Sequence, residues 1–240
     1  PLQEMNVSIT HNNGLLPIKV FNHNNQHIPI NHTLNVGSAQ VKSSILLAAL
    51  NTKGTTTIWE KIPSRDHTEI MLKFLGANLI KEKNIIKLTS PNFLKPKELR
   101  IPGDFSSAAF VIIAVLLSKK SKVKLKDVGL NYFRTGLLDV LKKMNANITV
   151  KNKRKFNGET VGDIEVESSN LVATVVNKRI VPRLIDEYPI LFVAASYASG
   201  VSEFYGLKEL KVKESNRLTS MSNALSKNGV KLELGNDSIK

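Results

Sequence analysis

The residues best suited to chemistry lie at the starts of two predicted helices in the last quarter of the chain. Asp186 and Glu187 precede an apolar helix, and the segment 211–217, KVKESNR, places Glu214 between cations. General acid–base catalysis needs two carboxylates in different environments, and cations hold anionic substrates in place. A charged segment such as 211–217 is also typical of a solvated helix start. The pattern therefore predicts an acid–base site and leaves a structural role open.

A second group of residues, 37–43 (GSAQVKS), is close to a phosphate-binding loop but does not match one. A nucleotide-binding P-loop has a second glycine directly before its Lys-Ser, whereas this chain has Val41, and a β-branched residue resists the positive φ required there. ATP or GTP binding is therefore not expected. Ser38 is instead predicted to cap a helix whose first N–H groups suit an anion. The alternative is that Ser38 only caps its helix.

A third group, 64–69 (SRDHTE), stands at the entrance to another predicted helix. Arg65 would add a bidentate fork to the helix N-terminus, which suits phosphate or carboxylate. Arg134 precedes Asn145 by 11 residues, just as Arg65 precedes Gly76 by 11. This match leaves open the possibility that Arg65 merely anchors a loop.

These groups occupy equivalent places in an internal repeat. A short phrase recurs: an apolar residue, two others, a second apolar residue, Asn or Gly, then Ala or Val. It covers 2–7, 72–77, 141–146 and 225–230, with Asn228 replacing the second apolar residue in the last copy. The intervals between copies are 70, 69 and 84 residues, so one supersecondary unit is expected to be used several times.

Each full copy predicts the same order of elements. An apolar helix (38–50, 106–117, 189–197) leads to a short strand (55–59, 122–126, 201–205), and an amphipathic helix closed by the phrase precedes another strand. This order indicates the α/β class. The segment 95–103, KPKELRIPG, interrupts the pattern and predicts a division into 1–100 and 101–240. The expected apolar faces of the second helices are Met71, Phe74 and Leu75; Leu137, Leu138 and Leu141; and Leu218, Met221 and Leu225.

The composition excludes several classes of function. The 240 residues contain no cysteine, which rules out disulfides, thiolate metal sites and a cysteine nucleophile. No apolar run approaches the ~20 residues of a membrane span. The net charge of +14 permits nucleic-acid binding, but the lysines are scattered and aromatic residues are only 6%, too few for stacking platforms. In 122–126 (KVKLK) the alternating lysines predict the exposed face of a strand.

Six segments together resemble the enolpyruvyl transferase family, in particular its members that act on shikimate 3-phosphate. They are SAQVKSSILLAAL (38–50), SRDHTEIMLKFLGA (64–77), IPGDFSSAAF (101–110), RTGLLDVLKKMNA (134–146), LIDEYPILFVAA (184–195) and LKVKESNRL (210–218). The resemblance implies two domains of the family's inside-out α/β barrel fold, made of repeated βαβαββ-type units and incomplete at both ends. Residues 1–100 would belong to the N-terminal lobe and 101–240 to the C-terminal lobe.

The resemblance also implies the reaction and the site. The enolpyruvyl group of phosphoenolpyruvate would pass to the 5-hydroxyl of shikimate 3-phosphate with release of phosphate, without a cofactor or a metal. Asp186 would accept the proton of the attacking hydroxyl, and Glu214 would donate the proton at the methylene carbon. The implied substrate-binding residues are Ser38, Ala39, Gln40 and Arg65 for shikimate 3-phosphate, Gln40 also approaching phosphoenolpyruvate, Lys213 near the ring, and Arg217 for phosphoenolpyruvate.

Two positions depart from the family pattern. Asn216 stands where Asp is usual, and Ser44 stands where Ala is common. Further cationic residues of the family's site lie outside these 240 residues, so the chain alone is expected to be inactive. A cytoplasmic monomer is expected, with no nucleic-acid or membrane partner. The competing interpretations are a UDP-N-acetylglucosamine enolpyruvyl transferase, a basic nucleic-acid-binding module and an inactive relative.

Overall fold

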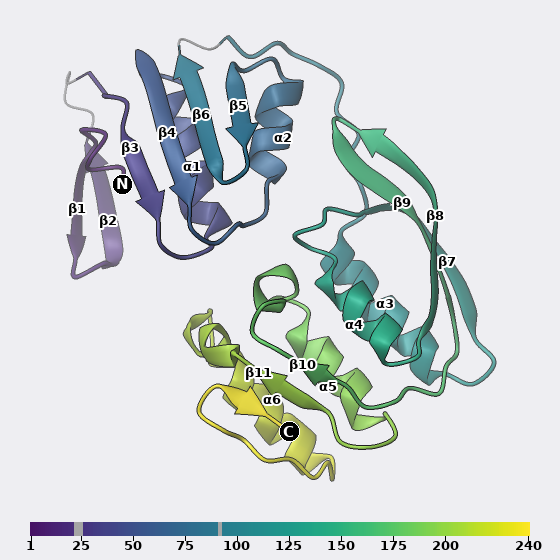
Figure 1. Cartoon of the computed structure of the whole chain (residues 1–240). Helices are drawn as coiled ribbons and strands as arrows, with labels where there is room; N and C mark the ends of the chain where they lie inside the picture. Colours follow the sequence, from purple (N-terminus) through teal and green to yellow (C-terminus); the bar gives the residue numbers. More distant parts are fainter. Residues whose placement is uncertain (22–25, 91–92) are drawn as a thin grey trace. The chain divides into compact units, whose positions relative to one another are not determined.

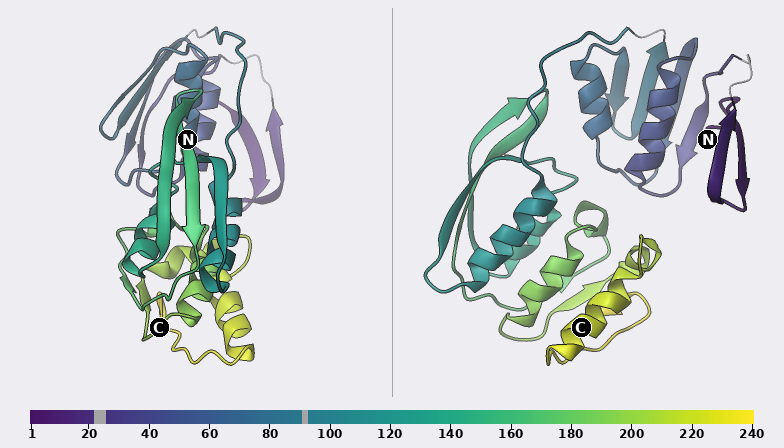
Figure 2. Two further views of the ribbon diagram at one scale, coloured as in Figure 1. Left: turned by 90° about the vertical axis from the view of Figure 1, so that its right-hand side faces the viewer. Right: turned by 180° about the vertical axis from the view of Figure 1, so that it is seen from behind.

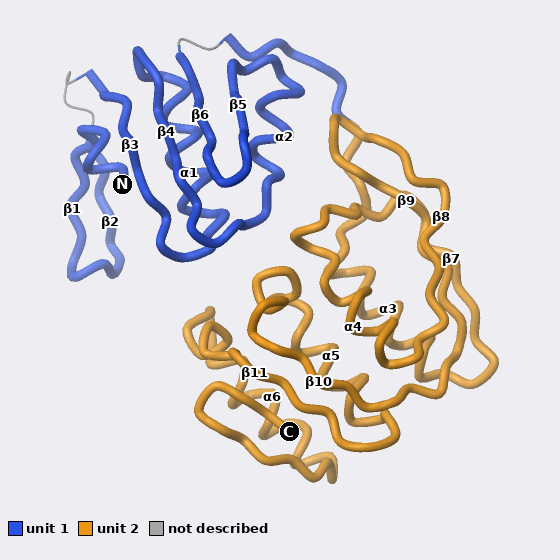
Figure 3. The backbone as a smooth tube through the Cα atoms, in the orientation of Figure 1, with its two compact units in different colours: residues 1–99 blue, residues 100–240 orange. Residues whose placement is uncertain are grey.

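The computed structural model describes residues 1–21, 26–90 and 93–240 and divides the chain into two compact units, 1–99 and 100–240 (Figures 1 and 3). The division falls within the proline-containing segment 95–103. Each unit has its own hydrophobic core. Within the described part of the chain, every helix is too short or too polar to cross a membrane.

Unit 1 contains one complete β-α-β-α-β-β repeat. Its strands form one sheet in the order β3-β4-β6-β5, in which β3 and β4 are parallel and the other pairs antiparallel. Helices α1 and α2 cover the same face of this sheet, as the right-hand view of Figure 2 shows. A separate antiparallel hairpin is formed by β1 (Ser8–Asn12) and β2 (Leu15–Phe21). The repeat consists of β3 (Asn31–Leu34), α1 (Ala39–Ala49), β4 (Gly54–Glu60), α2 (His67–Phe74), β5 (Leu79–Glu82) and β6 (Ile85–Ser90).

The second copy of the repeat begins unit 2 and keeps the same order. Its antiparallel sheet runs β7-β9-β8, and Gly103 forms a parallel bridge to Val128 where the first copy has β3. Strand β7 is longer than predicted because a bulge after Leu125 lets its pairing with β9 continue to Gly129. The elements are α3 (Phe105–Leu117), β7 (Lys122–Gly129), α4 (Gly136–Lys143), β8 (Asn147–Phe156) and β9 (Glu159–Glu167).

The third copy completes unit 2. Strands β10 and β11 pair in parallel and β11 pairs with β12 antiparallel, while α5 contacts both α3 and α6. The predicted α/β repeats are therefore confirmed, with helix ends within one residue of those expected for the three apolar helices. The elements are β10 (Val175–Val176), the 3₁₀ turn η1 (Val181–Arg183), α5 (Tyr188–Ser196), β11 (Glu203–Tyr205), the 3₁₀ turn η2 (Leu207–Val212), α6 (Arg217–Lys227) and β12 (Ser238–Ile239).

The repeated phrase is a C-terminal cap. Its Asn or Gly has a positive φ in all four copies, 67° at Asn6, 93° at Gly76, 64° at Asn145 and 83° at Gly229. The next residue then donates its N–H to the carbonyl five residues earlier, as in Ala77 to Leu72 at 2.9 Å and in the other three copies at 3.0–3.1 Å. This is the Schellman arrangement, and Gly and Asn are the residues that best tolerate its left-handed position. The phrase recurs because each copy needs this cap.

The apolar faces predicted for the second helices are correct for α4 and wrong for α2. Leu137, Leu138 and Leu141 are buried in the core of unit 2. In α2 the buried residues are instead Glu69 and Leu72, and the predicted Met71, Phe74 and Leu75 are only half-buried. A glutamate occupies the buried side of α2 because a lysine of α1 neutralises it, as described below.

Three lysines on the sheet of unit 2 are paired with acidic residues of the central strand β9. Lys124 Nζ lies 3.3 Å from Asp163 Oδ2, and Lys151 Nζ lies 2.7 Å from Glu165 Oε2. Lys122 pairs with Glu167 in the same way. The exposed, alternating lysine face predicted for 122–126 is confirmed, and its cross-strand ion pairs make it a poor surface for tracking phosphates.

Candidate functional site

The candidate residues of unit 1 lie at one edge of its sheet. Strands β3 and β4 are parallel, so both end at this edge, β3 at Leu34 and β4 at Glu60. The loop after β3 leads into α1, and the loop after β4 leads into α2. The edge at the carboxyl ends of parallel strands is where α/β folds generally bind ligands. Two helix N-termini therefore meet the edge at which an anion would be expected.

The start of α1 is built as a capped helix N-terminus. Ser38 is the N-cap, with an extended backbone and a side-chain oxygen that accepts from the Val41 N–H at 3.3 Å. Ser38 and Ala39 are half-buried, Gln40 is exposed, and the first turn of α1 has no acidic residue. The helix field therefore acts on an anion without a competing carboxylate in that turn.

Gly37 has a packing role. A Cβ at this position would lie 3.2 Å from Ile62 Cγ2 and 3.3 Å from the Ile62 carbonyl oxygen. The glycine lets the loop that follows β4 pass close to the backbone that enters α1. The sequence similarity to a P-loop therefore reflects packing between two loops.

Lys42 belongs to the interior, although the sequence placed it with the phosphate-binding candidates. Its side chain is fully buried, and its Nζ lies 3.0 Å from Glu60 Oε1 and 2.8 Å from Glu69 Oε1. No sequence signal in 37–43 predicts these partners, which come from β4 and α2. The charge of Lys42 is neutralised by two carboxylates, so this lysine is not placed to bind an anion at the sheet edge.

Arg65 follows a residue that is tightly held. Ser64 is buried and donates both its backbone N–H, at 3.1 Å, and its hydroxyl, at 2.6 Å, to Glu60 Oε1. Arg65 itself is half-buried and interacts with other side chains or backbone groups. Its position beside the N-termini of α1 and α2 suits an anionic ligand, and the hydrogen bonds of Ser64 anchor the loop that carries it.

In unit 2 the fold brings the two predicted catalytic carboxylates to one arginine. Arg217, the first residue of α6, places Nη1 3.3 Å from Asp186 Oδ1 and Nη2 2.6 Å from Glu214 Oε2. Asp186 is half-buried just before α5, whereas Glu214 is exposed. The two carboxylates thus have the different environments that acid–base chemistry requires.

The electrostatics of Glu214 reflect this arrangement. A hydrogen bond from its own backbone N–H, and then the Arg217 guanidinium, hold the pKa of the Glu214 carboxyl below its usual value. Glu214 is therefore ionised while Arg217 is bonded to it. A ligand that drew Arg217 away would remove the second of these two interactions, which lower the pKa of Glu214.

Lys213 stands apart from this pair. It is half-buried, and its Nζ lies 3.5 Å from Glu209 Oε1, one turn earlier in the chain.

The departure at Asn216 is explained by the structure. Asn216 is the N-cap of α6, and its Oδ1 accepts from the Thr219 N–H at 3.1 Å. Asn and Asp serve equally well at this position, so the substitution preserves the helix start that carries Arg217.

Sequence reasoning missed the partners of Glu187, the residue next to Asp186. The neighbouring Glu187 is buried, accepts a hydrogen bond from Ser106 Oγ at 2.5 Å and lies 3.7 Å from Arg134 Nη2. Burial raises the pKa of the Glu187 carboxyl. Arg134 also bonds Ser106 and lies 3.4 Å from Asp104 Oδ1, so it anchors the loop before α4 to the starts of α3 and α5. Arg134 thus has the anchoring role that was the alternative for its counterpart Arg65.

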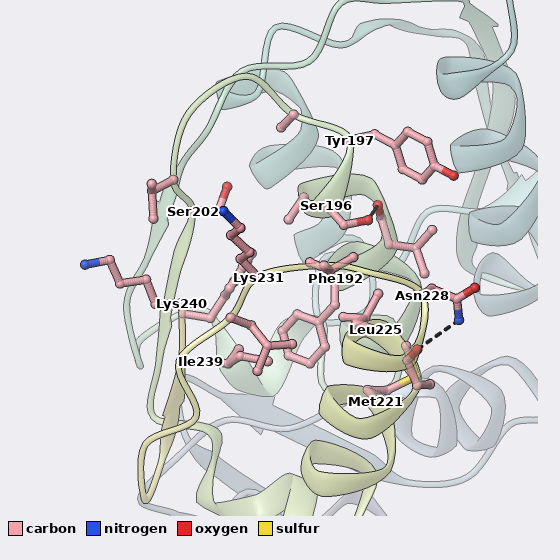
Figure 4. A pocket seen from close by; sticks show the side chains of 18 of the residues that line it. Phe192, Ser196, Tyr197, Ser202, Met221, Leu225, Asn228, Lys231, Ile239 and Lys240 are labelled. Atoms are coloured by element: carbon pink, nitrogen blue, oxygen red, sulfur yellow. Dashed lines mark hydrogen bonds between the residues drawn. The ribbon is translucent and has the colours of Figure 1, made fainter.

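A pocket lies elsewhere in unit 2, away from the predicted site residues. It has a volume of about 760 Å³ and is lined by α5, α6 and the end of the chain, with apolar side chains such as Phe192, Met221 and Leu225 (Figure 4). None of the eight predicted site residues lines it. Among the described residues, no group of three or more His, Asp or Glu side chains could hold a metal ion.

The chain resembles known proteins along its whole length. The family model described as EPSP synthase (3-phosphoshikimate 1-carboxyvinyltransferase) matches residues 1–240. A 3-phosphoshikimate 1-carboxyvinyltransferase of Zymomonas mobilis is 48% identical over 216 residues, which are 88% of this chain and 48% of that protein. One of Vesicomyosocius okutanii is 43% identical over 241 residues, covering 100% of this chain and 55% of that protein.

Solved structures agree with these relatives. An EPSP synthase structure from Acinetobacter baumannii superimposes with a TM-score of 0.87 at 37% identity, covering 99% of this chain and 54% of that one. The enolpyruvyl transferase NikO from Streptomyces tendae shares the fold, with a TM-score of 0.71 at 13% identity over 99% of this chain and 56% of its own. The chain thus spans about half the length of the relatives it matches.

Proposed function

Because this chain belongs to the EPSP synthase family, we propose that the protein containing it transfers the enolpyruvyl group of phosphoenolpyruvate to the 5-hydroxyl of shikimate 3-phosphate. The observation that carries the proposal is the family match along all 240 residues. We place the activity in the cytoplasm, in a monomer, with 1–100 in the N-terminal lobe and 101–240 in the C-terminal lobe.

The reaction is an addition followed by an elimination. The hydroxyl oxygen attacks C2 of phosphoenolpyruvate while Asp186 accepts the hydroxyl proton and Glu214 donates a proton to C3. Loss of a C3 proton and of phosphate then restores the double bond and leaves the enolpyruvyl ether. No covalent bond to the protein is formed, which suits a chain without cysteine.

We assign shikimate 3-phosphate to the sheet edge of unit 1. Ser38, Ala39 and Gln40 would contact it at the capped start of α1, and Arg65 would add a cationic fork. The absence of an acidic residue from the first turn of α1 supports this assignment. Lys213 would contact the ring of the same substrate.

We assign phosphoenolpyruvate to Arg217, with Gln40 also contacting it. Binding of this anion would draw the guanidinium away from Glu214 Oε2, to which it is bonded at 2.6 Å. The carboxyl of Glu214 would then lose one of the causes that lower its pKa, and protonation would become easier. The same event would prepare the proton donor and bind its substrate.

The test is phosphate release from phosphoenolpyruvate by the full-length protein, with shikimate 3-phosphate and then with UDP-N-acetylglucosamine as acceptor. Release with shikimate 3-phosphate alone is expected. Asp186→Asn should lower kcat by roughly 10²- to 10⁴-fold, the usual contribution of a general base. Asp139→Asn is the matched control, since Asp139 pairs with Arg183 outside the proposed site. Release only with the nucleotide sugar, or an Asp186→Asn variant as active as the control, would contradict the proposal.

A further inference from the structure

A buried cluster of charges lies directly behind the proposed shikimate 3-phosphate residues of unit 1. Lys42, Glu60 and Glu69 come from α1, β4 and α2, and each side chain is at most 2% exposed. Lys42 Nζ bonds one oxygen of each carboxylate, at 3.0 Å and 2.8 Å. Removing three charges from water costs free energy even when they pair, so the presence of the cluster requires an explanation.

The repeat shows that the fold does not need these charges. Lys42 is the fourth residue after the N-cap of α1, and the same count from the N-caps of α3 and α5 gives Ala108 and Leu191. Glu69 lies seven residues before the capping Gly76, and the same count gives Leu138 before Asn145 and Ser222 before Gly229. Uncharged residues thus serve at these places in the other copies. Because an apolar replacement of a buried ion pair is commonly neutral or stabilising, stability does not account for the cluster.

The cluster instead holds the loop that carries Arg65. Glu60 Oε1 accepts both the backbone N–H and the hydroxyl of Ser64, and Lys42 Nζ lies 3.4 Å from the Ser64 carbonyl oxygen. Three atoms of Ser64 are therefore bound by residues that also fix α1 and α2. Helix α1 is tied to α2 a second time near its start, because Ser43 Oγ lies 2.6 Å from Thr68 Oγ1.

We propose that Lys42, Glu60 and Glu69 are positioning residues that hold Arg65 and the start of α1 in the one geometry that binds the phosphate of shikimate 3-phosphate. The inference rests on the proposed function and deepens it. A bidentate arginine contact depends on position as well as charge, and displacement of a binding group by about 1 Å can cost 10²-fold in rate. An apolar cluster would pack, but it would offer no hydrogen bonds to the three polar atoms of Ser64.

The test uses the full-length protein and a variant without these charges or the Ser64 acceptor, Lys42→Met/Glu60→Met/Glu69→Leu. Steady-state phosphate release would be measured against each substrate, with thermal unfolding measured in parallel. We expect KM for shikimate 3-phosphate to rise about tenfold or more. KM for phosphoenolpyruvate should rise less, by about threefold or less, because Gln40 is the one residue of unit 1 assigned to it, and kcat should change less than about threefold. A merely structural role would lower stability without this split between KM values.

Two further variants keep the test decisive. Glu69→Gln retains the Lys42–Glu60 pair and should fold even if the triple variant does not, with KM for shikimate 3-phosphate raised about threefold. Ile86→Val removes one buried methyl group from β6 in the same core and serves as the control for lost stability, with unchanged KM values. Wild-type KM for shikimate 3-phosphate in either cluster variant would overturn the inference. Failure of the wild-type protein to release phosphate would instead refute the proposed function, so the two failures are distinguishable.

Discussion

Arg217 offers the sharpest test of the proposed chemistry, because it contacts both candidate catalytic carboxylates. Replacing it by methionine keeps the side-chain stem and removes the charge that bonds Asp186 at 3.3 Å and Glu214 at 2.6 Å. The side chain of Arg217 is about 25% exposed and that of Asp186 about 27%. Their interaction therefore lies between the water limit of about 1 kcal/mol and the roughly 4 kcal/mol expected near a protein surface.

The expected effect on catalysis follows from this burial. Removing one partner of a buried, hydrogen-bonded charge pair costs about 2–5 kcal/mol, which is roughly 30-fold to several thousandfold. Because Arg217 is a quarter exposed, we expect the lower part of this range, a fall of about 100-fold in kcat/KM for phosphoenolpyruvate. KM for shikimate 3-phosphate should change less than about threefold, since Arg217 is not among the residues assigned to that substrate.

The same variant predicts a change in the titration of Glu214. Its pKa is lowered first by its own backbone N–H and then by Arg217. In Arg217→Met the pKa should rise toward the ordinary value of 4.5 and remain below it, because the backbone hydrogen bond persists. An NMR titration of the Glu214 side-chain carboxyl in the full-length protein would measure this shift.

The matched control is Arg183→Met, another arginine of unit 2 with a carboxylate partner. Arg183 bonds Asp139 at 2.8 Å and stacks on the Tyr132 ring, outside the proposed site. It should lose stability and keep kcat/KM within about threefold of wild type. Equal losses in the two variants, or an Arg217→Met variant with nearly wild-type kcat/KM, would refute the reasoning.

Three predictions concern stability, measured by urea unfolding. Gly76→Ala should lower the free energy of unfolding by about 1–2 kcal/mol through left-handed strain, because φ is 93° and the nearest atom to a new Cβ is 3.7 Å away. Asn145→Gly, at φ 64°, should raise the free energy of unfolding by a few tenths of a kcal/mol. Effects of the opposite sign would contradict the capping argument. Leu141→Ala should cost about 2–5 kcal/mol, since the side chain is fully buried, and a cost below about 1 kcal/mol would mean that α4 is not packed as described. Asp163 has its pKa lowered to about 2 by hydrogen bonds from Asn152, Arg154 and Lys124. The ionised Asp163 therefore contributes to stability above pH 3.8, and this contribution is lost as pH falls through about 2. The difference in free energy of unfolding between wild type and Asp163→Asn should shrink over that pH window. A difference that does not depend on pH would be inconsistent with an ionised Asp163.

Local features of the chain determined the repeats and the helix ends. A left-handed backbone position accepts few residue types, so the cap appears as Asn or Gly at Asn6, Gly76, Asn145 and Gly229. Helix starts are similarly restricted, and Ser38 could be predicted as an N-cap from its neighbours alone. The order of helices and strands followed, because their spacing and periodicity are written in contiguous residues.

Contacts between distant residues decided the rest. The chain predicted the candidates Asp186, Glu214 and Arg217, but only the packing of α5 against α6 brings Asp186 within 3.3 Å of a guanidinium 31 residues later. Lys42 shows the limit most clearly. Its sequence neighbours suggested an anion at the start of α1, whereas the carboxylates that it binds lie 18 and 27 residues away on β4 and α2. Whether a buried cation faces a ligand or a carboxylate depends on which elements pack around it, and that is a property of the folded sheet and its helices.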